Sequence, residues 1–386
     1  MKTKLDVLLI ARPDHSLQIY NSLVGQKELS FLYVTFKVFP KWLKILIGNK
    51  RMIAIQKNVK CSWRLTFIDL CKYKFHLKFA QNWDETHVFS SILKKIFRHK
   101  KVHIIHYWPE YGDETIQDYI QTYDGVYAFA DIHMPLPSIV YEYMKPIYLK
   151  YGINPESTQL ALIAKEQGNF IDKAKNILVP SSYVADTYKT MYQGKNYYII
   201  SYGISVSKIY EKQYRTKIKD FVYAGRISLE KGADLLLEYF SHHREYVIHL
   251  YGNVSNGQEF IFDKYKRFSN ILFHGTVPKV ELSQYLKNYH VGIHLSRFDA
   301  YSLAVGEMLG VGLPVIVSSN TGNKDDILKE KLGLVTQLTM HSIEKTIQTI
   351  TNIDIYNQFI DNIDEFIHTK NISYGEKILD FYKTLK

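Results

Sequence analysis

Short apolar runs alternate with longer stretches of helical periodicity along almost the whole sequence. This alternation indicates an α/β fold built on parallel sheets, because parallel neighbours need a crossover between them, usually a helix. In the first half we expect strands at 6–11, 29–36, 101–108, 124–133 and 175–181. The helical patterns between them lie at 15–24, 86–99, 138–151 and 156–171.

A second series of the same kind follows "NYYIISYGIS" (196–205). Its expected strands are 219–227, 244–253, 270–277, 290–296 and 313–319. Two consecutive series predict two Rossmann-like doubly wound domains, the first at 1–202 and the second at 203–364. An amphipathic helix, 365–386, is expected to pack back on the first domain. Ligands of such sheets bind beyond the carboxyl ends of the strands, so we expect the site in the cleft between the domains.

Composition narrows the class of protein. The chain has 386 residues, of which 46% are hydrophobic, enough for two cores. No apolar run reaches the roughly 18 residues that a membrane-spanning helix needs. Cys61 and Cys71 are the only cysteines, too few for a disulfide framework or a zinc site. We therefore expect a reduced, cytoplasmic protein.

Positive charge is concentrated in residues 36–101. This segment has 16 Lys or Arg and 3 acidic residues, within a net charge of +11 for the whole chain. Aromatic residues are interleaved with the charge, as on surfaces that dock on anionic lipid headgroups. A basic face that only keeps the protein soluble is the alternative. No nucleic-acid-binding signature is present, so we expect no nucleic-acid partner. The basic segment leads us to expect peripheral attachment to the inner face of the plasma membrane.

The stretch "YAGRISLEKG" (223–232) has the pattern of an anion-binding turn. A strand ends at Gly225, Arg226 follows, and Lys231 stands at the head of a helix. Glycine permits close approach of the backbone to a ligand, and a helix N-terminus flanked by cations favours an anion such as a diphosphate. An ordinary turn with solvated basic residues is the alternative.

The stretch "FDAYSLAVGEMLGVGLPVIV" (298–317) places two carboxylates around a helix start. Asp299 lies just before the expected helix, and Glu307 lies about one and a half turns inside it. Ser302 and Leu303 would offer first-turn N–H groups to a phosphate. Glu307 would accept hydrogen bonds from a ribose diol, and Asp299 from a sugar. The alternative is an N-cap aspartate with one surface glutamate.

These motifs, in this order, resemble glycosyltransferase family 4, whose members are retaining enzymes of the GT-B fold. The stretch 299–317 resembles the family's Glu-x7-Glu box, and 222–232 resembles its Gly-Arg-x-x-x-x-Lys-Gly loop. "NILVPSSYVADTY" (176–188) and "IISYGISVSKIY" (199–210) resemble further family segments. The sequence departs from the family at Asp299, where a Glu is usual, and at Ser302, where a Gly is usual. It also lacks the usual Gly-Gly loop at "ARPDHS" (11–16).

The resemblance implies transfer of a sugar from a nucleotide-diphosphate sugar to an acceptor hydroxyl, with retention. Arg226, Lys231 and the amides of Ser302 and Leu303 would stabilise the departing diphosphate, with Gly225 beside it, and Glu307 would hold the ribose. His133, in "VYAFADIHM", and Asp299 would contact the donor sugar. His106, in "HIIHYW", would lie near the acceptor. A structural role is the alternative for both histidines.

The resemblance also bears on cofactors and partners. The chain has no Asp-x-Asp motif, so we expect a metal-independent reaction without a cofactor. The family's commonest setting is bacterial surface-polysaccharide synthesis, which implies a saccharide or lipid-linked saccharide acceptor. Two other functions stay open. One is a sugar-nucleotide 2-epimerase on the same fold, and the other is a non-catalytic GT-B protein that stabilises a partner.

Overall fold

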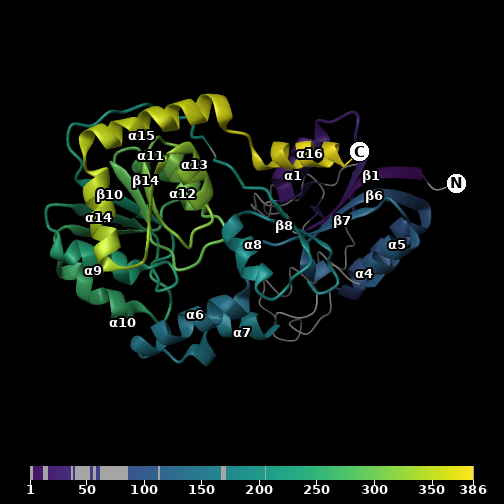
Figure 1. Ribbon diagram of the computed structural model, residues 1–386, viewed down its shortest axis with the longest axis horizontal. Coiled ribbons are helices and arrows are strands. Elements are labelled where there is room, and N and C mark those ends of the chain that lie inside the picture. The colour runs from purple at the N-terminus through teal and green to yellow at the C-terminus, as the bar shows by residue number, and fades with distance from the viewer. Residues whose placement is uncertain are drawn as a thin grey trace.

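The chain forms two parallel α/β lobes, which lie side by side in Figure 1. The computed structural model describes residues 3–11, 16–35, 38–39, 53–54, 58–60, 86–111, 114–166, 171–204 and 206–385. Much of the predicted basic segment, 36–101, lies outside these residues, as does 12–15 of the "ARPDHS" loop. The two doubly wound, parallel-sheet domains confirm the predicted fold class.

The first sheet has seven parallel strands among the described residues, in the order β5-β2-β1-β6-β7-β8-β9. Their bounds are β1 (Thr3–Ile10), β2 (Phe31–Val34), β5 (Val59–Lys60), β6 (Lys100–Tyr107), β7 (Tyr127–Asp131), β8 (Asn176–Val179) and β9 (Asn196–Ile199). A separate short pair joins β3 (Val38–Phe39) to β4 (Ile53–Ala54). The strand order reverses direction between β1 and β6, so the loops after these strands face a common crevice.

Helices connect the strands of this first half. They are α1 (Ser16–Val24), α4 (Thr86–His99), η3 (Pro109–Tyr111), α5 (Glu114–Thr122), α6 (Pro137–Lys150), η4 (Pro155–Ser157), α7 (Gln159–Glu166) and α8 (Ser182–Lys189). Helix α4 illustrates why these segments are helical. Its apolar residues recur at helical spacing and bury Phe89, Leu93 and Ile96, while Lys94 and Arg98 face solvent.

Within the part of the chain that the structure describes, the second sheet has six parallel strands in the order β12-β11-β10-β13-β14-β15. They are β10 (Asp220–Ala224), β11 (Val247–Tyr251), β12 (Ile271–Gly275), β13 (Val291–His294), β14 (Val315–Ser318) and β15 (Gly333–Thr336). Its helices are α9 (Ala233–His242), α10 (Glu259–Phe262), η5 (Asp263–Arg267), α11 (Lys279–Leu286), α12 (Leu303–Leu309), α13 (Lys324–Glu330), α14 (Met340–Ile350) and α15 (Ile353–Glu365). The order reverses between β10 and β13, which is where the two predicted motifs begin.

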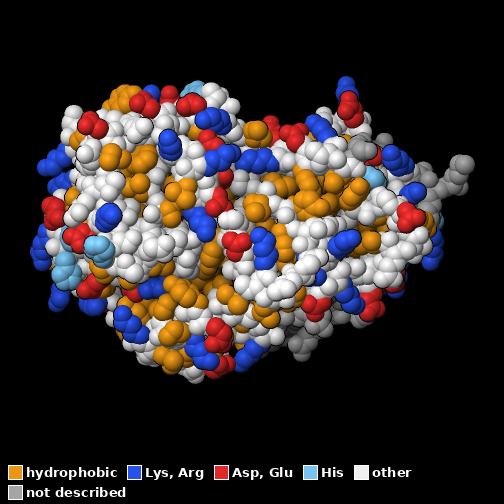
Figure 2. All heavy atoms as spheres, viewed as in Figure 1, with side chains coloured by type: hydrophobic (Ala, Val, Ile, Leu, Met, Phe, Trp, Pro, Cys, Tyr) orange, Lys and Arg blue, Asp and Glu red, His pale blue; other side chains and the backbone are white. Residues whose placement is uncertain are grey.

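Helices α6 and α7 pack into the core of the second lobe, although they precede it in sequence. Val140, Met144 and Leu160 are buried in the same cluster as Phe221 of β10 and Leu236 of α9. Figure 1 shows both helices beneath the two lobes, and Figure 2 shows hydrophobic side chains gathered over the same region. The outer surface of these helices exposes Ile139, Tyr143, Leu149 and Leu162. The pair α6–α7 thus links the lobes below the sheets.

The end of the chain returns to the first lobe. A π-helical turn, η6 (Phe366–Lys370), extends α15, and α16 (Tyr374–Thr384) then lies against α1 (Figure 1). Ser373 and Glu376 form a capping box that starts α16. Gly375 lets α16 approach α1 closely, since an added Cβ would lie 2.3 Å from the Gln18 carbonyl oxygen. The tail is therefore two helices with a break at 371–373, where the sequence suggested one.

Candidate functional site

The loop after β10 carries Arg226 and Lys231 to the carboxyl edge of the second sheet. Gly225 has a φ of 139° and Gly232 a φ of 68°, conformations that side chains disfavour. An added Cβ on Gly232 would lie 1.9 Å from the Leu295 carbonyl oxygen, so only glycine lets the loop pack against the segment after β13. Local backbone geometry therefore accounts for both glycines of the motif.

A buried ion pair between Arg297 and Asp234 holds this loop in place. Arg297 donates two parallel hydrogen bonds to Asp234 of α9, at 2.6 and 2.8 Å, and a third to the Leu229 carbonyl. The Arg297 backbone N–H also donates to the Glu230 carbonyl at 2.9 Å. Both charges are almost fully buried, so the bidentate geometry compensates for their desolvation. Arg297 thus holds the loop that carries Lys231 by contacts with Leu229, Glu230 and Asp234.

Gly225, Arg226 and Glu307 line one cavity of about 400 Å³, a size usual for small-molecule pockets. The rest of its lining is Ala224, Tyr251, Gly252, Asn253, Thr276, Val277, Leu282 and Ala304. Three residues predicted from two distant motifs thus meet at the point where the strand order reverses. The lining combines apolar side chains, which suit a ring system, with polar ones.

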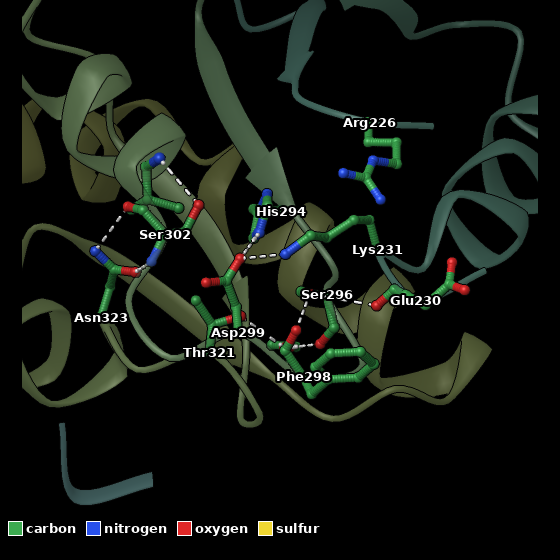
Figure 3. Close-up of polar contacts among 12 residues, drawn as sticks. Arg226, Glu230, Lys231, His294, Ser296, Phe298, Asp299, Ser302, Thr321 and Asn323 are labelled. Atoms are coloured by element: carbon green, nitrogen blue, oxygen red, sulfur yellow. Dashed lines mark hydrogen bonds and ion pairs between the residues drawn. The ribbon is translucent and has the colours of Figure 1, made fainter. Parts of the chain in front are cut away.

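Asp299 lies beside Lys231 at the centre of Figure 3. Its Oδ2 accepts hydrogen bonds from Lys231 Nζ at 2.6 Å and from His294 Nε2 at 3.1 Å. His294, at the end of β13, is 3% exposed, and its ring stacks on that of Tyr223. The structure brings together two predicted residues, Lys231 and Asp299, and joins them to a histidine that was not predicted.

The surroundings of Asp299 and His294 determine which of the two side chains is charged. Burial alone would raise the pKa of Asp299, but the charge of Lys231 and the hydrogen bond from His294 outweigh it and hold that pKa well below its usual range. Burial lowers the pKa of His294. Asp299 is therefore a carboxylate, and His294 is a neutral imidazole whose Nε2–H donates to it. The other ring nitrogen of His294, Nδ1, has no hydrogen-bond partner among the described residues.

Ser302 is the N-cap of α12, whereas the sequence suggested Asp299 as the alternative for that position. The Ser302 side chain accepts from the Val305 N–H at 3.5 Å. Its own N–H, however, donates to Asn323 Oδ1 at 2.6 Å, and Asn323 Nδ2 donates back to the Ser302 carbonyl (Figure 3). We expected a free amide at Ser302, yet Asn323 occupies it, whereas no described hydrogen bond engages the Leu303 N–H.

His133 lies after β7, with its side chain one-fifth exposed. Nδ1 lies 2.7 Å from the Tyr202 hydroxyl, Nε2 lies 3.6 Å from Asp131 Oδ2, and the ring packs on Trp108. Tyr202, in the linker between the lobes, packs in turn on Tyr301, two residues after Asp299. A continuous chain of contacts thus connects His133 with the segment that carries the second motif.

His106 is fully buried at the end of β6. Its Nε2 lies 2.8 Å from Asp131 Oδ2 and its Nδ1 lies 2.6 Å from the Tyr382 hydroxyl of α16. Asp131 also accepts a hydrogen bond from Tyr374 at 3.3 Å. The side chain predicted to face the acceptor is enclosed by the core, and this geometry favours a role in holding Asp131 and α16.

Several residues of the site had no signal strong enough for prediction. His294 reads in sequence as one more residue of the strand "HVGIHLS", and Asn323 lies in the stretch "TGNKDDI" (321–327), which by itself does not indicate contact with Ser302. Asp131 stands two residues before His133, so both lie at the same edge of the first sheet. That spacing could have indicated Asp131 as a residue of the site. Tyr382 lies far away in sequence, and only the return of the C-terminal helix brings it to His106.

Among the described residues, no three His, Cys, Asp or Glu lie together as a metal site would require. None of the helices in that part of the chain combines the length and hydropathy needed to cross a bilayer.

Comparison with a family model covers the second lobe. Residues 208–365 match the family described as glycosyl transferases group 1. The matched segment is less than half of the chain. It contains Arg226, Lys231, His294, Asp299 and Glu307, so the pocket and the Lys231–Asp299 pair belong to the matched part.

One curated relative and several solved structures are similar to the chain. Protein CapJ of Staphylococcus aureus is 29% identical over 133 residues, which is 31% of this chain and 34% of CapJ; the chain thus spans about a third of this relative. A glycosyltransferase from Rickettsia africae has a TM-score of 0.59 at 14% identity, covering 100% of this chain and 98% of that one. The lipopolysaccharide outer core galactosyltransferase WaaB gives 0.61 at 15%, covering 98% of both. HepE of Anabaena, in complex with UDP and glucose, gives 0.60 at 11%, covering 99% of both. These structures confirm the GT-B fold.

Proposed function

We propose that this chain is a glycosyltransferase that moves a sugar from a nucleotide-diphosphate sugar to an acceptor hydroxyl, with retention and without a metal. The observation that carries the proposal is the pocket shared by Gly225, Arg226 and Glu307, in a domain that matches glycosyl transferases group 1. Neighbours of the same fold include a galactosyltransferase and a protein in complex with UDP and glucose, which supports a nucleotide-sugar donor.

Each residue of the site has its own role in the proposed reaction. Arg226 and Lys231 supply positive charge where the diphosphate departs, and fixed charges of this kind stabilise the transition state. An ammonium group has three N–H donors, so Lys231 can hold Asp299 with one and bind phosphate oxygens with the others. Glu307 accepts hydrogen bonds from the ribose hydroxyls. His133 and the second carboxylate oxygen of Asp299 orient the donor sugar.

We further propose that the acceptor is a saccharide on a lipid carrier and that the enzyme works at the cytoplasmic face of the membrane, in surface-polysaccharide synthesis. WaaB, a lipopolysaccharide outer core galactosyltransferase, supports this setting by its similarity of fold. Helix α4 adds a physical reason, because its exposed face carries Lys94, Lys95 and Arg98. Basic residues near an anionic surface each contribute about 1 kcal/mol.

The test is a turnover assay with purified protein and a panel of UDP-, GDP-, ADP- and dTDP-sugars. We expect one donor to release its nucleoside diphosphate, faster with a glycosylated lipid acceptor than without it, and equally fast with and without EDTA. The anomeric configuration of the product, read by NMR, reports retention. Conversion of the donor to an isomeric sugar nucleotide without an acceptor would identify the 2-epimerase instead. A protein that turns over no donor would favour the non-catalytic alternative.

A further inference from the structure

We propose that a second pocket, next to the nucleotide pocket, binds the sugar part of the acceptor; this inference rests on the proposed function. The pocket has a volume of about 620 Å³. One wall is residues 153–159, which join α6 to α7, and the other is formed by the loops after β10 and β11. The segment 153–159, which precedes the second lobe in sequence but packs with it, and two loops of that lobe therefore form the pocket together.

The position of the pocket connects it to the donor site. Arg226 and Asn253 line this pocket and also the 400 Å³ nucleotide pocket. In Figure 3, Arg226 and Glu230 lie on the opposite side of Lys231 from Ser302 and Asn323. A ligand in the second pocket would thus share contacts with a bound nucleotide sugar, as the second substrate of a group transfer must.

The chemistry of the lining identifies the class of ligand. Hydroxyl and amide side chains dominate, including Ser157, Thr158, Gln159 and Asn256. Arg226 and Glu230 add one charge of each sign, so the lining is neutral overall and does not favour a polyanion. Among the described residues, no hydrogen bond engages the side-chain amides of Gln159 and Asn256. Free amide donors and acceptors in a neutral pocket fit a ligand rich in hydroxyl groups.

Buried contacts fix the wall that carries Glu230. Its Oε1 accepts a hydrogen bond from Tyr148 of α6 at 2.6 Å, and both its oxygens lie 3.3 Å from Gln258 Nε2. Gln258 in turn accepts from the Leu229 N–H at 2.8 Å. Beside them, Tyr151 donates to Asp234 at 2.9 Å. The carboxylate is held in one orientation before a ligand arrives, which reduces the entropic cost of binding.

The opposite wall is also fixed by hydrogen bonds. Glu156 accepts from Tyr141 at 2.6 Å and from Lys165 at 2.8 Å, which ties the turn to the helices on either side of it. Thr158 Oγ1 donates to the Pro155 carbonyl at 2.7 Å and accepts from the first turn of α7. Hydrogen bonds thus fix both walls, and Tyr148 and Tyr151 connect one wall to the other, so the site is formed before a ligand binds.

The experiment is saturation-transfer NMR on the full chain with methyl glycosides of glucose, galactose, mannose, N-acetylglucosamine and N-acetylmannosamine, with and without UDP. The double variant Gln159→Ala/Asn256→Ala removes the two amides, and Gln121→Ala removes an exposed amide from α5 as a matched control. We expect at least one glycoside to receive saturation from the wild type and the control. That signal should fall at least fivefold in the double variant.

The outcomes separate this inference from the proposed function. Equal glycoside signals in the wild type and the double variant would overturn the assignment of the pocket, and so would a wild type that binds no glycoside in either condition. UDP affinity, measured in parallel by calorimetry, tests the donor site. If UDP and the other nucleoside diphosphates do not bind but the glycoside signal depends on Gln159 and Asn256, the proposed function fails while the saccharide site stands.

Discussion

The pairing of Lys231 with Asp299 makes a quantitative prediction about stability. Lys231→Met removes a cation 2.6 Å from a carboxylate whose side chain is 14% exposed, while Lys231 itself is 29% exposed. Exposed pairs contribute about 0.2–1 kcal/mol, and breaking a fully buried pair costs about 3–5 kcal/mol. The partial burial of both groups places the expected coupling free energy between these limits, at about 2 kcal/mol.

A double-mutant cycle measures this coupling. Lys231→Met, Asp299→Asn and the double variant are unfolded by heat or urea, and the coupling is the part of the free energy of unfolding that does not add. About 2 kcal/mol corresponds to a shift of about 4–8 °C in Tm for a domain of this size. The exposed pair of Lys165 and Glu156, at 2.8 Å, is the control and should give less than about 1 kcal/mol. Strictly additive effects at Lys231 and Asp299 would refute the pairing.

The pH dependence of the same variants gives a second readout. The pKa of Asp299 is depressed in the folded chain, so its contribution to stability is present above the unfolded pKa of about 4 and is lost as the pH falls through the folded value. Lys231→Met raises the folded pKa of Asp299. The difference in stability between wild type and variant should therefore be full at neutral pH and should shrink as the pH falls through the folded pKa of Asp299 in the variant towards the lower one in the wild type.

Three further predictions concern other parts of the molecule. Arg226→Ala should lower turnover at least a hundredfold, as loss of one transition-state donor typically does, with an unchanged Tm; near wild-type turnover would exclude the diphosphate role. Tyr382→Phe, which leaves a buried histidine nitrogen without its partner, should cost about 1–3 kcal/mol by urea denaturation, whereas Tyr285→Phe on the surface should be neutral. Lys94→Gln/Lys95→Gln should reduce co-sedimentation with anionic liposomes at low salt; a wild type that ignores such liposomes would contradict membrane attachment.

Local patterns made the fold predictable from the sequence. Strand and helix periodicity located all the expected strands to within a few residues, because a doubly wound sheet alternates elements with little irregularity. The sequence carried no comparable signal for the packing of α6 and α7 against the second lobe. Their buried faces, such as Met144 and Leu160, look like those of any surface helix until the partner is known.

The site residues that lie in short motifs were predictable from the sequence, whereas their partners from distant segments were not. Gly225, Arg226 and Glu307 are set by short motifs at strand ends, and the structure brings them to one pocket. The partners of these residues come from distant segments, as Asn323 does for Ser302. The shorter side chain of Asp299 is the most informative departure, because the structure pairs it with Lys231 and His294. Its contact with the donor sugar and the role of His133 stay predictions.

Calorimetric titration of nucleoside diphosphates into the wild type and into Glu307→Ala tests the central claim most directly. The pocket lined by Gly225, Arg226 and Glu307 should bind one of UDP, GDP, ADP or dTDP, and Glu307→Ala should weaken that binding at least tenfold through loss of the ribose hydrogen bonds. Failure of every nucleotide to bind the wild type, or equal affinity in the variant, would contradict the assignment of this pocket to the donor.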